Sequence, residues 1–148
     1  MAKEAVIIGS DHAGFRLKEA LKKAFQRKIS IVDMGAYSTD PVDYPDIAKK
    51  VAKKVKAGRA EGAKGILICG SGTGMCIAAN RFKGIRAVAA YDAYSARMSR
   101  LDNDSNILCL RGRNFSPAKA KGITSIWLKT GFSGKKRHSR RIRKLDRL

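Results

Sequence analysis

A cysteine followed by closely spaced glycines is the segment of this sequence that most clearly suggests chemistry. Cys69 ends an apolar run and leads into a turn made of Gly70, Ser71, Gly72, Thr73 and Gly74. Because glycine has no Cβ, the backbone N–H groups of such a turn can approach an anion closely. The turn lacks the Gly-Lys-Ser/Thr ending of a P-loop, and Met75 replaces the third glycine of a dinucleotide fingerprint. We therefore expect an anion-binding turn, with a turn needed only for packing as the alternative.

Cys69 has the setting of a catalytic base. It ends an expected strand directly before an expected helix, and a helix N-terminus stabilises a thiolate. The alternative is a small buried apolar side chain, which is the commoner role of such a cysteine. Cys76 and Cys109 lack this setting, so we expect both to be structural thiols. The spacings match neither a zinc site nor a disulfide framework, so all three cysteines are expected to be reduced.

In two further clusters a histidine lies beside charged residues. The turn at residues 10–14 places Asp11 beside His12, although Asp11 could simply cap the following helix. The only other histidine, His138, lies between Arg137 and Arg141. Arginines four residues apart share one helical face and can bind a phosphate together. A solvated or nucleic-acid-binding tail is the alternative for this second cluster.

The elements that must position these residues alternate between strand and helix. Apolar runs predict strands at residues 5–9, 29–34, 65–69, 85–91 and 107–110. Apolar residues at helical spacing predict helices at 17–25, 45–57, 75–80, 93–101 and 117–129, and a last basic helix at about 134–148. This order requires crossover connections, and it therefore predicts an α/β fold of three layers, α/β/α, with a five-stranded parallel, Rossmann-like sheet. Ligands bind at the carboxyl ends of such strands, so the turns after the first, third and fifth strands should form the site.

Size and composition are those of a globular protein. The chain has 148 residues, of which 44% are hydrophobic, so a single domain over residues 1–148 is expected. The first apolar run is far too short for a signal peptide and no segment approaches a membrane span, so we expect a cytoplasmic protein. The net charge of +20 favours phosphate or nucleic acid ligands. The charge is densest at residues 129–148, which hold nine Lys or Arg and one acidic residue, Asp146.

Together these segments resemble the type B ribose-5-phosphate isomerases and the related galactose-6-phosphate and allose-6-phosphate isomerases. The resemblance covers nearly the whole chain and rests on residues 9–15, 42–45, 69–75, 77–80 and 103–104, and on Arg137, His138 and Arg141. It implies an aldose–ketose isomerisation through an enediolate, without metal or cofactor, in the pentose phosphate pathway. It also implies a homodimer with shared active sites, with a tetramer as an alternative.

The resemblance further implies the catalytic roles. Cys69 would move a proton between C1 and C2 of the sugar, and the N–H groups of residues 70–74 would stabilise the oxyanion. Asp11 and Ser71 would transfer protons at the sugar oxygens, and Asn103 would hold the reacting end.

Substrate binding is implied for a second set of residues. Tyr44 would line the pocket. The phosphate would be bound by His12, Arg113, Arg137 and Arg141, with the arginines coming from the partner subunit.

Two positions depart from the family's pattern. The family's ring-opening histidine is replaced by Asp102, and a carboxylate is a weaker acid at neutral pH. Ring opening would then be slow, be taken over by His138, or concern a different sugar. The Gly-Gly that precedes Arg-His in the family is Gly134-Lys135-Lys136 here, with one extra residue, which could shift the phosphate-binding residues.

We therefore predict a ribose-5-phosphate isomerase. An isomerase of a six-carbon sugar phosphate, such as allose 6-phosphate or galactose 6-phosphate, is the first alternative. The second is a nucleic-acid-binding protein on an isomerase scaffold, which is disfavoured because no aromatic ladder accompanies the basic residues. The two histidines lie far apart in the sequence and lack an acidic partner at ligand spacing, so no metal site is expected.

Overall fold

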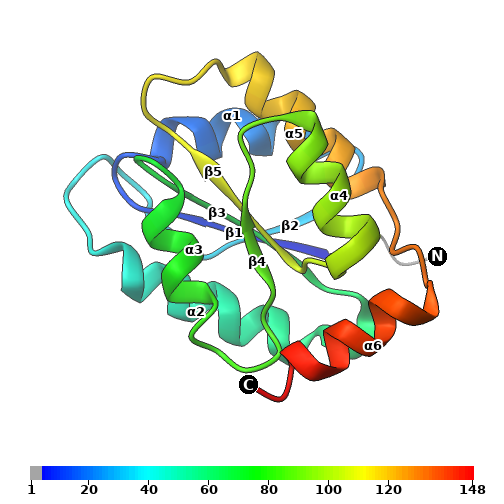
Figure 1. Cartoon of the computed structure of the whole chain (residues 1–148). Coiled ribbons are helices and arrows are strands. Elements are labelled where there is room, and N and C mark those ends of the chain that lie inside the picture. Colours follow the sequence, from blue (N-terminus) through cyan, green and yellow to red (C-terminus); the bar gives the residue numbers. More distant parts are fainter. Residues whose placement is uncertain (1–4) are drawn as a thin grey trace.

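A parallel five-stranded sheet forms the centre of the molecule. The computed structural model describes residues 5–148, and residues 1–4 lie outside the described part. The strands run in the order β2-β1-β3-β5-β4, and every neighbouring pair is parallel (Figure 1). Their bounds are Ala5–Ser10 for β1, Ser30–Asp33 for β2, Lys64–Cys69 for β3, Ala87–Ala89 for β4 and Ile107–Arg111 for β5.

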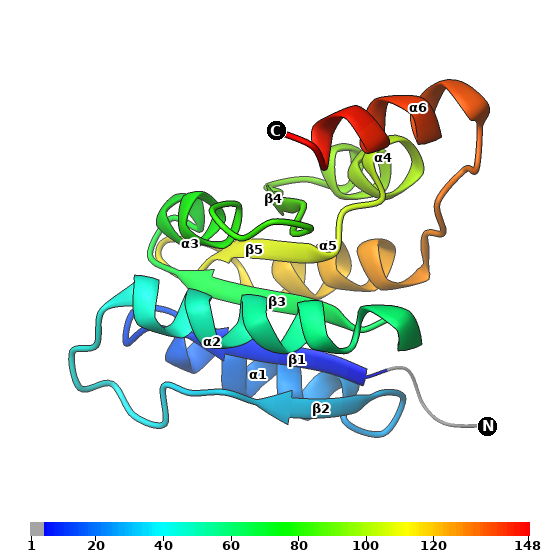
Figure 2. The same ribbon diagram turned by 90° about the horizontal axis from the view of Figure 1, so that it is seen from below.

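Helices cover both faces of this sheet, and one more helix lies outside these layers. The bounds are Phe15–Phe25 for α1, Tyr44–Ala57 for α2, Thr73–Ala79 for α3, Ala93–Asn103 for α4, Pro117–Lys129 for α5 and Lys136–Leu145 for α6. A short 3-10 helix, Arg59–Glu61, follows α2. Seen from below, α1 and α2 lie on opposite sides of the sheet, while α6 packs against α4 (Figure 2).

The central strands are buried on both faces, which explains why they appear in the sequence as uninterrupted apolar runs. In β3, Ile66 and Ile68 pack against α1, α4 and α5, whereas the alternate residues Leu67 and Cys69 pack against α2 and α3. The expected three-layer α/β/α fold is therefore confirmed.

The edge strand β4 is shorter than its apolar run. A strand was expected over residues 85–91, but β4 spans only Ala87–Ala89. Before it, the N–H of Arg86 donates to the Asn106 side chain at 2.7 Å. After it, Asp92 accepts a hydrogen bond from the Ser95 N–H at 2.7 Å and caps α4. Backbone hydrogen bonds to the β5 segment continue at Arg86 and Ala90, and side-chain bonds take over beyond them.

The basic residues of α2 form a solvent-exposed face, as expected. All five of these lysines are exposed: Lys49, Lys50, Lys53, Lys54 and Lys56. No helix formed by residues 5–148 combines the length and the apolar character needed to cross a membrane.

A buried ion pair fixes the chain beside the carboxyl end of β1. The side chain of Lys18 is 0% exposed, and its Nζ lies 2.7 Å from both carboxylate oxygens of Asp33 and 2.6 Å from the Ala36 carbonyl oxygen. Lys22 also donates to Asp33, at 2.7 Å. Burial opposes ionisation of Asp33, but the hydrogen bonds from the two lysines outweigh it and hold the pKa of Asp33 below its usual value. The segment that follows β2 is therefore anchored next to Ser10, whose N–H donates to the Gly35 carbonyl.

Candidate active site

A cavity of about 550 Å³ lies at the carboxyl ends of β1, β3 and β5. Its lining residues are Asp11, Tyr44, Cys69, Gly70, Ser71, Gly74, Tyr91, Arg111 and Arg113. This position agrees with the expectation for a parallel sheet, because the loops after neighbouring strands meet there. A second cavity of about 430 Å³ lies beside β4 and the last turn of α4. The second cavity contains no thiol or imidazole, so we place the chemistry in the first.

Cys69 is the last residue of β3, and it lines the cavity although the residue is only 5% exposed. The Gly72 N–H donates to its Sγ at 3.2 Å. A sulfur that accepts an N–H bond is stabilised in the thiolate form. The strand end therefore presents a nearly dehydrated sulfur with a donor already directed at it.

Two of the glycines are closely packed in the turn. Gly72 has φ +82°, a conformation that side chains rarely adopt, and a Cβ there would lie 3.1 Å from the Leu110 carbonyl. A Cβ on Gly74 would lie 2.8 Å from Cζ of the Tyr44 ring. The turn is thus packed between β5 and Tyr44, which keeps its N–H groups close to Cys69.

Ser71 and Thr73 are exposed and bonded to each other in this turn. Their hydroxyl oxygens are 2.7 Å apart, and the Thr73 N–H donates to the Ser71 Oγ at 3.2 Å. The Tyr91 hydroxyl donates to the Ser71 carbonyl at 2.8 Å. These bonds orient the Ser71 hydroxyl at the rim of the cavity.

The turn after β1 contributes Asp11 and His12. The Asp11 carboxylate accepts the Gly14 N–H at 3.0 Å, so it stabilises the approach to α1 while also lining the cavity. The Val42 N–H donates to Nδ1 of His12 at 3.2 Å. A neutral His12 therefore carries its proton on Nε2, which is left as a donor.

Arg113 was expected from the partner subunit, but it lines the cavity of the same chain as Cys69, because the chain turns back over Gly70 after β5. Tyr91 and Arg111 line the cavity without having been expected there. The Arg113 guanidinium packs on Gly70, where a Cβ would come within 3.3 Å of Nη1. Arg111 donates from Nε to the Arg113 carbonyl at 2.7 Å. Arg111 ends β5, so the strand-end rule that selected Cys69 could have selected it too. Tyr91 follows β4, and nothing in its local sequence indicated that its hydroxyl reaches Ser71.

Three expected site residues, His12, Gly72 and Thr73, do not line the cavity themselves but belong to the turns that do. Five others lie away from it within one chain: Asp102, Asn103, Arg137, His138 and Arg141. They lie on the last turn of α4 and on α6, at the edge of the sheet where strands begin (Figure 1). The His138 Nε2 lies 3.4 Å from the Asp102 Oδ1, and His138 is buried. Arg137 and Arg141 are exposed.

The other two cysteines form a pair behind the cavity. Cys109 is fully buried in β5, as expected, and burial raises its pKa well above the usual range. Cys76 on α3 is only half-buried, and a hydrogen bond with Cys109 lowers the pKa of Cys76 to about 7 against the opposing effect of burial. All three cysteines are free thiols. Across residues 5–148, no group of three or more His, Cys, Asp or Glu side chains is placed to hold a metal ion.

Known proteins similar to this chain match it over nearly its full length. The family model described as Ribose/Galactose Isomerase matches residues 6–145. The ribose-5-phosphate isomerase B of Escherichia coli is 42% identical over 138 residues, which cover 93% of this chain and 91% of that protein. The D-erythrulose-4-phosphate isomerase 2 of Mycolicibacterium smegmatis is 43% identical over 131 residues, covering 86% of this chain and 85% of that one.

A solved structure agrees with the sequence matches. Ribose-5-phosphate isomerase B from Mycoplasma genitalium, crystallised with bound ribulose-5-phosphate, superposes with a TM-score of 0.92 at 37% identity. The superposition covers 99% of this chain and 97% of that chain. Family model, sequence and fold agree with one another, and the chain therefore belongs to the ribose/galactose isomerase family as a sugar phosphate isomerase.

Proposed function

We propose that the chain interconverts ribose 5-phosphate and ribulose 5-phosphate through an enediolate. The observation that carries this proposal is the Cys69 sulfur, which lines the cavity at the end of β3 and accepts the Gly72 N–H at 3.2 Å. Aldose–ketose isomerisation needs one base that can remove a proton from a carbon and return it to the next. It also needs donors for the negative charge that develops on the neighbouring oxygen.

The cavity supplies a group for each of these steps. The Cys69 thiolate takes the C2 proton of the aldose and delivers it to C1, which regenerates the thiolate. The N–H groups of residues 70–74 stabilise the enediolate oxygen. Asp11 and Ser71 line the same cavity and exchange protons with O1 and O2. His12, with its Nε2 proton free to donate, and Arg113 bind the phosphate.

A second copy of the chain completes each site in this proposal. Asn103, Arg137 and Arg141 lie at the opposite edge of the sheet from Cys69, so they cannot act on a substrate held in their own chain's cavity. In a two-fold dimer, the same residues of each copy would face the other copy's cavity. Size-exclusion chromatography with light scattering tests for the dimer, and a monomer that is fully active at nanomolar concentration would contradict the shared site.

A four-carbon substrate is the second candidate. The specific observation is that Asp102, at the position expected for ring opening, is paired with the buried His138. A tetrose 4-phosphate cannot form a furanose ring, because its C4 oxygen is esterified, and it therefore needs no ring-opening acid. A relative at 43% identity is a D-erythrulose-4-phosphate isomerase.

A substrate panel decides between these sugars. The initial rates should be measured with ribose 5-phosphate, erythrose 4-phosphate, allose 6-phosphate and galactose 6-phosphate, for the parent and for Cys69→Ser. We expect turnover of the pentose phosphate, with kcat at least about 10²-fold lower in Cys69→Ser. A parent that turns over only the four-carbon sugar supports the second candidate, whereas a Cys69→Ser variant as active as the parent refutes the thiolate mechanism. Asp102→His tests the ring-opening position, since it should raise kcat on sugar phosphates that form rings, such as ribose 5-phosphate, and leave kcat on erythrose 4-phosphate unchanged.

The proposal also places the enzyme in the pentose phosphate pathway and in the cytoplasm. The three free thiols support a reducing compartment, where a nucleophilic cysteine stays active.

A further inference from the structure

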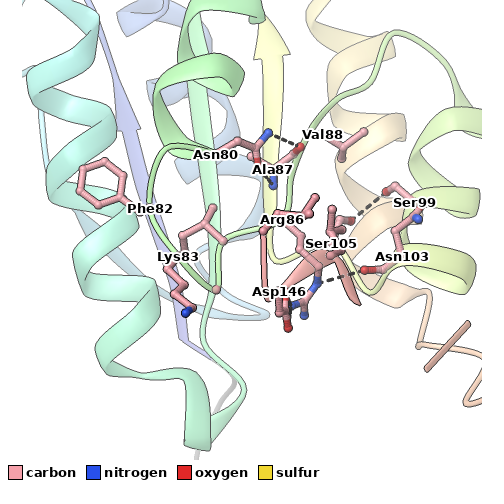
Figure 3. A pocket seen from close by; sticks show the side chains of 14 residues that line it. Asn80, Phe82, Lys83, Arg86, Ala87, Val88, Ser99, Asn103, Ser105 and Asp146 are labelled. Carbon is pink, nitrogen blue, oxygen red and sulfur yellow. Dashed lines mark hydrogen bonds and ion pairs between the residues drawn. The ribbon is translucent and has the colours of Figure 1, made fainter. Parts of the chain in front are cut away.

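Arg86 occupies an unusual position for an arginine in so basic a chain. It immediately precedes β4, and its side chain is only 8% exposed. The guanidinium uses three nitrogens: Nε donates to the Asn103 and Asp104 carbonyls at 3.1 Å, Nη1 to both carboxylate oxygens of Asp146 at 3.0 and 3.1 Å, and Nη2 to the Asp104 carboxylate at 3.4 Å. Figure 3 shows Arg86 between Asn103 and Asp146 in the cavity beside β4. One side chain therefore joins the end of α4 to the end of α6.

The first of these two contacts sets the position of Asn103. Asp104 ends α4 in the left-handed conformation, with φ +47°, and its carboxylate lies between Arg86 and the Nη1 of Arg100, at 2.8 Å from the latter. This turn, held from both sides, fixes the backbone of Asn103 while its side chain stays exposed. Asn103 is thus presented outward from a rigid base.

The second contact, between Arg86 and Asp146, attaches the basic helix α6 to the rest of a positively charged chain. Six of the ten residues of α6 are Lys or Arg, in a chain of net charge +20. Asp146 is the only acidic residue among residues 129–148, and it is bonded to Arg86. At the other end of α6, His138 contacts Asp102. The contacts of Asp102 and Asp146 thus attach α6 to the end of α4 at two points. Arg137 and Arg141 lie exposed on α6.

We propose that Arg86 and Asp146 are positioning residues that hold Asn103 and the arginines of α6 at a fixed spacing. This inference rests on the proposed function, in which Asn103 meets the reacting end of a sugar phosphate and Arg137 and Arg141 meet its phosphate. The two ends of one substrate lie at a fixed separation, so their ligands must keep that separation as well. Misplacement of a substrate-binding group by about 1 Å can cost about 10²-fold in rate.

Variants that remove one or both contacts of Arg86 distinguish a role in positioning substrate-binding residues from a role in stability alone. Asp146→Asn weakens the hold on α6 alone, and we expect KM for the sugar phosphate to rise about 10-fold with kcat within about 2-fold of the parent. Arg86→Met frees both Asn103 and α6, so kcat should fall as well and kcat/KM should drop about 10²-fold. Arg86→Lys should recover part of the loss in kcat/KM, since lysine keeps the positive charge but lacks the forked guanidinium. Arg59→Gln is the matched control, because Arg59 also approaches Asp146, at 3.6 Å, but its side chain is 56% exposed.

Inorganic phosphate gives a readout that does not depend on turnover. Calorimetric titration should show phosphate binding about 10-fold more weakly to Asp146→Asn than to the parent and to Arg59→Gln. A purely structural role would lower the folded fraction, and hence apparent kcat, with KM and phosphate affinity unchanged; that result overturns the inference. A parent inactive on every sugar phosphate refutes the proposed function alone, and the titration still decides this inference. Equal phosphate affinity in parent and Asp146→Asn, or no binding by the parent, refutes it.

Discussion

Replacing Gly74 with alanine tests whether Tyr44 forms a wall of the substrate cavity. The new Cβ would lie 2.8 Å from Cζ and 2.9 Å from Cε2 of the Tyr44 ring. Carbon atoms in contact are about 3.5 to 4.0 Å apart, so the ring must move by roughly 0.7 Å or more. Tyr44 is 40% exposed, so the ring can swing outward without disrupting the core.

The expected result is a loss of activity without a loss of stability. Gly74 lies in the first turn of α3, where alanine is favoured over glycine by about 0.5 to 1 kcal/mol. This gain offsets the displacement of an exposed ring, so the melting temperature should stay the same or rise slightly. A shift of this size in a group that contacts substrate but does not react should lower kcat/KM by about 10-fold, less than the roughly 10²-fold for a reacting group.

The assay compares kcat/KM and melting temperature for the parent, Gly74→Ala and Gly122→Ala. Gly122 is a matched control, since it lies within α5 and a Cβ there meets nothing within 4 Å. Gly122→Ala should be slightly more stable and fully active. If Gly74→Ala keeps the parent's kcat/KM while its crystal structure shows the Tyr44 ring displaced, Tyr44 has no part in binding. An unmoved ring would refute the steric reasoning itself.

Ionisable groups away from the cavity give further measurable expectations. Lys18→Met removes the buried amine from Asp33, and the free energy of unfolding should fall by about 3 kcal/mol in a denaturant titration; a change below about 0.5 kcal/mol would contradict this. Because the pKa of Asp33 is lowered on folding, its contribution is complete above about pH 4 and is lost as the pH falls further. The stability difference between parent and Lys18→Met should therefore narrow at pH 3, and a constant difference would argue against the ion pair. With a pKa of about 7, Cys76 should be alkylated by iodoacetamide with a rate that rises through neutral pH while Cys109 stays unlabelled, as peptide mass spectrometry can show.

Sequence reasoning succeeded where the relevant physics is local. The apolar run ending at Cys69 and the glycines after it determine a strand and a tight turn within a few residues. The helical spacing of apolar residues likewise predicted α2 and α5 closely. Such features follow from periodicity and from the missing Cβ of glycine, both of which are visible in one short segment.

Contacts between distant segments could not be predicted in the same way. Arg86 and Asp146 are separated by 60 residues, and they meet only because α6 folds back on α4. Ser71 follows β3 and Tyr91 follows β4, and these strands are separated in the sheet only by β5, so the Tyr91 hydroxyl can reach the Ser71 carbonyl. Lys18 stands among the apolar residues of α1 and is buried only because Asp33 lies next to it. Each of these residues is of a type that usually lies at the surface, and only the folded chain shows which partner it meets.

The opposite placement of Cys69 and α6 has a genetic consequence. Under the proposed arrangement, a chain carrying Cys69→Ser and a chain carrying Arg141→Ala are each inactive with copies of themselves. A mixed dimer, however, combines the intact cavity of one chain with the intact helix of the other in one of its two sites. When the two inactive variants are coexpressed and pair at random, about half of the dimers are mixed and each has one intact site. The activity should therefore return to about a quarter of the normal rate.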